Sequence, residues 1–291
     1  MLNTILTKRV ILVAALTWLL LPAAVQADIV YVSSYDGTIR KIMPDGSVSQ
    51  FASGLGQVTG LAFDNAGNLY AASYSGNTIS KISPAGTVTP FASGLAGPQG
   101  IAFDHSGILH AGNSASDSIS KIMPDGTVSQ FIGGIVAIGF AFDSNGNLYV
   151  SDVANSTINK VTPTGVVTQF ASGLSEPTGL AFDKSGNLYV DNYIGNTISK
   201  ITPGGSVSQF ASGGFHSPLG LAFDSTGNLY AANYDGGTIS KITPDGTVSQ
   251  YASGFNFPAY VAVEVPEPSA LALLCLCGLG TLARSRRKLV R

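Results

Sequence analysis

The side chains with the clearest capacity for chemistry are acidic, and they recur at one position of a repeated phrase. They are Asp64, Asp104, Asp143, Asp183, Asp224 and Glu264. Carboxylates gathered on a ring could hold a divalent cation. The five Asp residues, however, each precede an x-x-G turn, in which an Asp side chain accepts hydrogen bonds from backbone N–H groups. We therefore expect them to cap turns and predict no cofactor and no metal site; a divalent cation on this ring is the alternative.

The three histidines are the other candidates for acid–base or metal chemistry. His105 lies in a predicted turn, and His110 occupies a position that holds Tyr in other copies of the phrase. His216 lies in an insertion, residues 213–218, that departs from the repeat. A single His in a loop is more often solvated than catalytic. The sequence also contains no G-x-S-x-G, H-E-x-x-H, C-x-x-C or phosphate-loop motif, so we assign no catalytic residue.

A third group of candidates carries flat rings and suits binding. It consists of Tyr35, Tyr74, Tyr193, Tyr234, Phe215 and His216. Sugar rings stack on Tyr while neighbouring amides and carboxylates bond the sugar hydroxyls, and Asn192, Asn233 and Asp235 lie beside these tyrosines in the sequence. We predict that these six residues form a binding surface. Packing of the tyrosines between neighbouring structural units is the alternative.

The elements that position these residues repeat about every 40 residues. The phrase 60–99, which begins G-L-A-F-D-N-A-G-N-L-Y, restarts at Gly100, Gly139, Gly179 and Gly220. Within it, alternating side chains predict strands at 61–63, 69–73, 78–82 and 87–91, separated by turns rich in Gly, Pro, Asn and Asp. Such a four-stranded antiparallel meander has two apolar faces, which only stacked copies can bury. The sequence therefore predicts an all-β propeller.

The two ends of the repeat region predict the number of blades. Residues 29–35 match residues 68–74, so the first copy lacks its opening strand, and residues 259–264 repeat only that opening strand. Pairing of the two ends closes the ring and removes exposed sheet edges. We predict a six-bladed β-propeller over residues 28–264, with the N- and C-terminal strands in one shared blade. The loops between second and third strands then share one face with the connections between blades, and this face carries the predicted binding surface.

The charge of the propeller limits its partners, and its cysteine content excludes a disulfide. Residues 28–264 contain 8 Lys and Arg against 16 Asp and Glu, a net charge of about −8, so we expect no nucleic-acid partner. One lysine per copy recurs at a strand position, and we expect these lysines to be solvated; they are Lys41, Lys81, Lys121, Lys160, Lys200 and Lys241. Both cysteines, Cys275 and Cys277, lie in the C-terminal tail, so the propeller has no disulfide.

The two tails indicate export. Residues 1–27 contain two basic residues, an apolar run at 10–21 and a small-residue ending, which is typical of a secretory signal peptide cleaved after Ala27. Residues 265–291 contain Pro266, Glu267 and Pro268, an apolar run at 270–283 and a cluster of Arg residues. The apolar run predicts a short membrane helix, and the basic end fits the cytoplasmic side of the inner membrane.

Both parts resemble known families. The phrase G-[LI]-A-F-D-x-x-G-N-L-Y with T-I-S-K-I and a P-D-G turn resembles the NHL-repeat propellers and the related gluconolactonase-type and streptogramin-lyase-type propellers. The gluconolactonase resemblance implies metal ligands just before the Gly of each first strand; this sequence has Thr59, Gln99, Ile138, Thr178 and Leu219 there. The streptogramin-lyase resemblance implies a His and Glu pair with a metal. The tail resembles a PEP-CTERM sorting signal, which implies processing by an exosortase at the cell surface.

The sequence favours a secreted or surface-attached, noncatalytic propeller that binds or supports exopolysaccharide or a protein ligand in a biofilm matrix. The alternative is a metal-dependent lyase or lactonase of the streptogramin-lyase or gluconolactonase type. For that enzyme, His216 would be the candidate catalytic side chain, because it lies in the loop that departs from the repeat.

Overall fold

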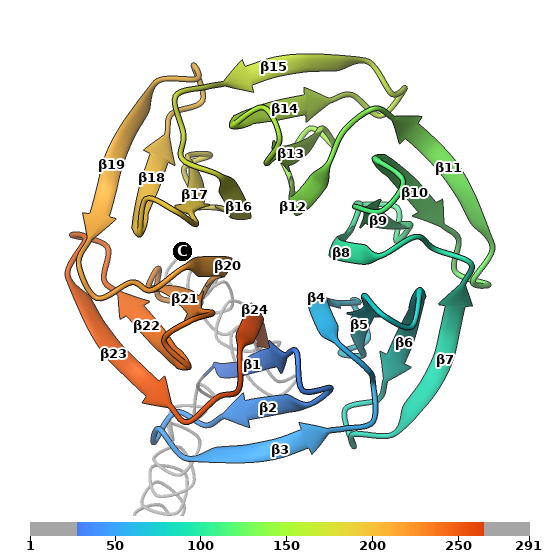
Figure 1. Ribbon diagram of the computed structural model, residues 1–291, viewed down its shortest axis with the longest axis horizontal. Coiled ribbons are helices and arrows are strands. Elements are labelled where there is room, and N and C mark those ends of the chain that lie inside the picture. Colours follow the sequence, from blue (N-terminus) through green and yellow to red (C-terminus); the bar gives the residue numbers. More distant parts are fainter. Residues whose placement is uncertain (1–27, 265–291) are drawn as a thin grey trace, which may run out of the picture. The chain divides into compact units, whose positions relative to one another are not determined.

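A closed ring of six β-sheets accounts for the repeat. The computed structural model describes residues 28–264. These residues form six blades, each a four-stranded antiparallel sheet (Figure 1). The first strand of each blade lies nearest the axis and the fourth strand forms the rim. The predicted all-β, six-bladed propeller is confirmed.

The strands follow chain order within every blade except the first. Blade 1 contains β24 (Pro258–Glu264), β1 (Ile29–Ser34), β2 (Ile39–Ile42) and β3 (Val48–Ala52). Blade 2 contains β4 (Val58–Phe63), β5 (Leu69–Ser73), β6 (Thr78–Ile82) and β7 (Val88–Ser93). Blade 3 contains β8 (Pro98–Phe103), β9 (Leu109–Asn113), β10 (Ser118–Ile122) and β11 (Val128–Gly133).

The other three blades have the same layout. Blade 4 contains β12 (Ala137–Phe142), β13 (Leu148–Asp152), β14 (Thr157–Val161) and β15 (Val167–Ala171). Blade 5 contains β16 (Pro177–Phe182), β17 (Leu188–Asn192), β18 (Thr197–Ile201) and β19 (Val207–Ser212). Blade 6 contains β20 (Pro218–Phe223), β21 (Leu229–Asn233), β22 (Thr238–Ile242) and β23 (Val248–Ser253).

The ring closes where the two ends of the propeller pair. Strand β24 lies antiparallel to β1, with Ala262 opposite Tyr31 and Glu264 opposite Ile29. The Tyr31 hydroxyl donates a hydrogen bond of 2.8 Å to the Glu264 carboxylate across this seam. The prediction that both ends share one blade is confirmed.

The first strands start earlier than the sequence predicted. Strand β4 begins at Val58, whereas residues 61–63 were expected from the alternation. Its pairing with β5 shifts register between Val58 and Leu61, so a bulge containing Gly60 interrupts the alternation that marks a strand. Because Gly60 interrupts the alternation of side chains, the sequence pattern did not predict the first half of β4.

The x-x-G turns form as the Asp side chains predict. In the turn after β4, the Asp64 carboxylate accepts hydrogen bonds from the backbone N–H groups of Ala66 and Asn68, at 2.9 and 2.8 Å. Burial would raise the pKa of Asp64, but these bonds and the Asn68 amide together hold it below the usual 3.8. The same arrangement recurs at Asp143, Asp183 and Asp224. The turn-capping role of these residues is confirmed.

An aromatic trio fills five of the six junctions between blades, and the junction between blades 6 and 1 has the pair Tyr230 and Tyr251. The ring of Tyr70 in blade 2 meets Phe91 of the same blade at 4.8 Å and Phe103 of blade 3 at 4.9 Å, both edge to face. His110 takes the Tyr position in blade 3, contacts Phe131 at 5.4 Å and is 3% exposed. Burial lowers the pKa of His110. His110 is therefore a core residue.

The lysines are less free than the sequence suggested. The ammonium of Lys81 lies 5.3 Å from the ring centre of Tyr70 and 3.6 Å from the Asp64 carboxylate. Equivalent cation–π contacts are made by Lys121, Lys160, Lys200 and Lys241. These five lysines therefore keep contact with solvent, as predicted, and in addition lie over an aromatic ring of the junction between blades.

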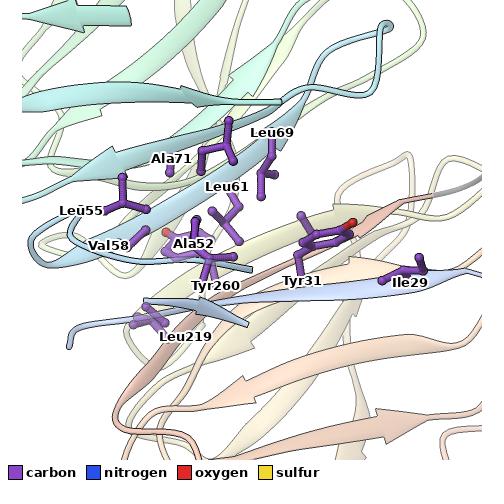
Figure 2. Packing of buried hydrophobic residues seen from close by; sticks show 14 residues of the cluster. Ile29, Tyr31, Ala52, Leu55, Val58, Leu61, Leu69, Ala71, Leu219 and Tyr260 are labelled. Carbon is purple, nitrogen blue, oxygen red and sulfur yellow. The ribbon is translucent and has the colours of Figure 1, made fainter. Parts of the chain in front are cut away.

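The axis is closed by backbone rather than by side chains. A Cβ atom on Gly60 would lie 2.2 Å from the Gln99 carbonyl oxygen, and one on Gly139 would lie 1.9 Å from that of Thr178. The equivalent position in β24 holds Tyr260, whose hydroxyl donates a buried hydrogen bond of 2.5 Å to the Ile138 carbonyl in blade 4. Figure 2 shows Tyr260 next to the inner strand of blade 2 within the hydrophobic cluster of that junction. Glycine at this position in the other five blades thus lets the inner strands approach closely, and the Tyr260 side chain reaches from blade 1 across the axis to blade 4.

Candidate functional site

The most distinctive surface lies over the axis, on the face of the loops between second and third strands. Two adjoining hollows of about 250 and 550 Å³ share Tyr35, Gln99 and Tyr234. The smaller also includes Ile138, Thr178 and Leu219, each one residue before an axial glycine, so it lies over the centre of the ring. We call the surface formed by the two hollows the mouth.

Four blades supply the aromatic side chains of the mouth. They are Tyr193 from blade 5, Tyr234 from blade 6, Tyr35 from blade 1, Tyr74 from blade 2 and Phe257 from the connection between blades 6 and 1. Blades 3 and 4 contribute no Tyr because Ser114 and Val153 occupy the equivalent positions. The structure therefore brings the four sequence-predicted tyrosines together on one side of the axis.

Tyr234 is the centre of this cluster. Its ring centre lies 5.2 Å from that of Tyr35, 5.1 Å from that of Phe257 and 6.5 Å from that of Tyr193. Tyr35, Tyr193 and Tyr234 are partly buried, while Tyr74 is 37% exposed. Burial, followed by the neighbouring tyrosine hydroxyls, raises the pKa of Tyr35 to about 12. Burial also raises the pKa values of Tyr193 and Tyr234, so these three phenols are neutral donors and acceptors at physiological pH.

Phe215 and His216 lie apart from this cluster. Phe215 is 4% exposed and packs in the junction between blades 5 and 6, so its side chain is not available at the surface. The signal was present in the sequence, because Leu55, Leu95 and Ile135 fill the same position in other copies and are also buried. His216 is exposed and lies against Gly236 in the loop before β22.

The amides proposed from the sequence as sugar partners are already engaged. Asn233 is fully buried, and its side chain donates to Thr238 and Ser240 at 3.0 and 2.8 Å. Asn192 makes the same bonds in blade 5. Asp235 is exposed instead, and its carboxylate accepts a hydrogen bond from the Ser217 hydroxyl. The polar side chains that line the mouth are instead Asp36, Gln57, Gln99, Glu176, Thr178 and Asn256.

The floor of the mouth does not suit a carboxylate-bound metal. The hydroxyls of Thr59 and Thr178 donate to the carbonyls of Pro98 and Pro218, and Gln99 donates to Ser114. Within residues 28–264, no three His, Cys, Asp or Glu side chains gather as a metal-binding group. These side chains therefore do not match the ligand set that the gluconolactonase resemblance implies.

One buried carboxyl near the axis carries no signal in the sequence. Asp191 of β17 is fully buried, and neither carboxyl oxygen has a hydrogen-bond partner. A Cβ atom on Gly179 would lie 2.7 Å from it. Burial raises the pKa of Asp191 well above 3.8. Ser33 and Ser151 hold the equivalent position in other blades, and both bond to backbone there.

The opposite face carries a shallow notch between blades, repeated around the ring. The notch between blades 2 and 3 is about 330 Å³ in volume and includes Asp64, Tyr70 and Lys81. Similar notches lie between blades 4 and 5 and between blades 5 and 6. Because their Asp and Lys side chains already bond to each other or to their own turns, these notches are parts of the blade junctions.

Several sequence-based predictions concern residues outside the described range. These are the cleavage site after Ala27, the motif Pro266, Glu267 and Pro268, and the C-terminal membrane helix. Within residues 28–264 no helix has the length and hydropathy to span a membrane.

Comparison with known proteins identifies both parts of the chain. A PEP-CTERM protein-sorting motif matches residues 264–288, which confirms the interpretation of the tail and implies processing by an exosortase. No curated protein matches the chain. The Staphylococcus aureus virginiamycin B lyase aligns with a TM-score of 0.63 at 19% identity, over 80% of this chain and 84% of that one.

Two further solved structures share the fold. A Xanthomonas campestris gluconolactonase has a TM-score of 0.63 at 20% identity, over 70% of this chain and 78% of that one. A Bacteroides caccae protein of unknown function has a TM-score of 0.67 at 16% identity, over 83% of this chain and all of that one. The family model for virginiamycin B lyases matches residues 22–252, which is most of the sequence. The chain therefore belongs to the virginiamycin B lyase family.

Proposed function

We propose that this member of the family is an exported, noncatalytic propeller that binds polysaccharide at the cell surface through the mouth. The observation that carries the proposal is the clustering of five aromatic side chains from four blades over the axis. Aromatic faces stack on the apolar faces of sugar rings, and surrounding polar groups bond sugar hydroxyls. The PEP-CTERM motif supports the location, since it indicates export and association with the cell surface.

The partial burial of the cluster also favours binding. Tyr35 and Tyr234 meet edge to face, so each supports the other and little side-chain freedom is lost when a ligand docks. Tyr74 and Phe257, at 37% and 49% exposure, leave apolar area that a ligand could cover. A rigid centre with exposed flanks suits a chain of sugar residues laid across several blades.

The test is retention of the purified protein on polysaccharide from the producing organism. Replacing Tyr193 and Tyr234 together with Ala should abolish retention, because it removes the centre of the cluster and one wall. Val166→Ala, an exposed substitution in a turn of the opposite face, serves as the control and should leave retention unchanged. Equal retention of the double variant and the unmutated protein would exclude the mouth as the binding surface.

A metal-dependent lyase is the second candidate, and membership of the virginiamycin B lyase family favours it. On this hypothesis the purified protein contains a stoichiometric divalent metal and converts virginiamycin B, and His216→Ala abolishes turnover. His105→Ala is the matched control, because His105 is an exposed histidine in a turn of the opposite face. Turnover lost in the first variant and kept in the second would establish the enzyme and displace the binding role.

A further inference from the structure

We propose that the mouth selects sugars bearing an ammonium group, as in a deacetylated amino-sugar polymer. This inference rests on the proposed function and adds the charge of the ligand. It is carried by two features of the mouth: aromatic faces gathered around one hollow, and carboxylates on the rim with no cationic side chain among the residues that line it.

The aromatic wall offers several ring surfaces to a cation in the adjoining hollows. Tyr35 and Phe257 flank Tyr234 at ring-centre distances of 5.2 and 5.1 Å, and Tyr193 follows at 6.5 Å. A cation near an aromatic face within about 6 Å is attracted by the ring quadrupole, and several rings around one space add their attraction. A neutral sugar would use only the apolar faces of this wall. An ammonium-bearing sugar would use both the apolar faces and the quadrupoles.

Charged groups at the mouth carry one sign. Glu176 lines the smaller hollow and Asp36 the larger, and no Lys, Arg or His lines either of them. Burial raises the pKa of Tyr193, and the carboxylates of Asp235 and Glu176 raise it further, so both act at the aromatic wall. The mouth thus complements a cation in charge as well as in shape.

Arg40 and the strand lysines are directed away from the mouth, whereas His216 lies against Gly236, the residue after Asp235, without lining either hollow. Arg40, on the second strand of blade 1, donates to the Gly254 carbonyl at 2.6 Å and stacks over the Phe255 ring. The lysines contact the aromatic trios of the blade junctions, beside the turns that cap the opposite face. Arg40 and the lysines that make these contacts therefore do not offset the carboxylates of the mouth.

The backbone at Phe257 supports a role in binding. Phe257 has a left-handed φ of +51° and a side chain that is 49% exposed. The same backbone recurs at Gly97, so it belongs to the repeated connection before an inner strand, and in blade 1 that connection presents Phe257 at the mouth. Glu176 and Ser217 hold the same backbone position before other inner strands, with φ of +49° and +53°. Each of these residues either lines the mouth or orients Asp235, which lies beside it.

The experiment compares three tetrasaccharides of matched length by calorimetry at low ionic strength. They are β-1,4-linked glucosamine, its N-acetylated form and the corresponding neutral glucan. A cation in an aromatic cage lined by carboxylates should bind about tenfold more tightly than its neutral counterpart. We expect glucosamine to bind best at a pH where its amine is protonated, and we expect added salt to reduce this preference.

Two substitutions separate the local effect from bulk charge. Asp235→Asn should weaken glucosamine binding severalfold while leaving binding of the neutral glucan unchanged, and Tyr234→Leu should weaken both. Asp125→Asn is the matched control, because it removes one charge from an exposed turn on the opposite face. An equal loss in the Asp125 and Asp235 variants would mean attraction by net charge and would overturn the inference.

The outcomes also separate this inference from the function on which it rests. Equal or tighter binding of the acetylated or neutral tetrasaccharide would refute selection of the ammonium while leaving polysaccharide binding intact. Binding of none of the three would refute selection of the ammonium, and retention on the native polysaccharide would then decide the proposed function separately.

Discussion

Replacing Asp191 with Asn should stabilise the propeller relative to the unmutated protein, by an amount that grows as the pH rises. Asp191 is fully buried and neither of its oxygens has a hydrogen-bond partner, so its ionised form is strongly disfavoured in the folded state. Burial accordingly raises its pKa well above 3.8. Asn has nearly the same shape and carries no charge at any pH, so the substitution isolates the cost of keeping this carboxyl protonated.

The sign and size of the effect follow from proton binding. Below pH 3.8 the carboxyl is protonated in both the folded and unfolded states, and it makes no contribution to the pH dependence. Above pH 3.8 the unfolded chain releases the proton while the folded protein retains it. The free energy of unfolding of the unmutated protein therefore falls by about 1.4 kcal/mol for each pH unit, until the pH reaches the folded pKa of Asp191.

Urea denaturation of both proteins between pH 4 and pH 8 measures this difference. The variant should gain on the unmutated protein steadily from pH 4 upward, and each kcal/mol corresponds to roughly 2–4 °C in Tm for a domain of this size. Ser151→Ala is the matched control, because Ser151 occupies the same strand position in blade 4 and accepts a hydrogen bond from the Gly139 N–H at 2.7 Å. Its cost should be about 1 kcal/mol and constant with pH.

Two results would contradict this reasoning. A difference between Asp191→Asn and the unmutated protein that stays constant with pH would mean that the carboxyl titrates normally. A variant that loses stability relative to the unmutated protein as the pH rises would mean that Asp191 is ionised in the folded protein and stabilised by a positive partner. The first would put Asp191 in contact with solvent, and the second would indicate a bound cation at the axis.

Three further predictions concern the closure of the ring, the mouth and the turns. Tyr260→Phe should lower the free energy of unfolding by about 1–2 kcal/mol, because the Ile138 carbonyl loses its donor, and Tyr260→Gly should lower it by about 3–5 kcal/mol, because a cavity forms. Chemical denaturation measures both values, and equal losses would contradict the reasoning. Phe257→Gly should change stability by less than about 1 kcal/mol, because relief of the left-handed backbone offsets the lost contact with Tyr234, while polysaccharide retention falls. Acidification below pH 3.8 should lower Tm, because burial of Asp224 is outweighed by the hydrogen bonds within its turn, which keep its pKa low. The stabilising contribution of this carboxylate is therefore present above pH 3.8 and is lost as the carboxylate is protonated. Asp224→Asn should flatten the acid part of the Tm profile, and an unchanged acid part would contradict the prediction.

Local patterns in the chain were sufficient to predict the blades. The strands, their turns and the role of Asp64 depend on residues within a few positions of one another, and Asp64 forms its predicted bonds to Ala66 and Asn68. The incomplete first and last copies predicted the shared blade, since a strand missing at one end and supplied at the other can pair only if the ring closes. The side of the axis on which the tyrosines gather also followed from the repeat, because blades 5, 6, 1 and 2 are neighbours in a ring of six.

Only the tertiary structure decided which of these side chains are free to act. Phe215 and Asn233 looked accessible in the sequence, yet Phe215 packs between blades 5 and 6 and Asn233 is buried where it bonds the next strand of its own blade. The special positions of Asp191 and Tyr260 appear only when inner strands from several blades converge, because backbone packed against backbone at the axis leaves room for one aromatic side chain and no partner for one carboxyl. Turn and strand preferences act between near neighbours in the chain, whereas burial and the charge around a hollow are set by residues that only the closed ring brings together.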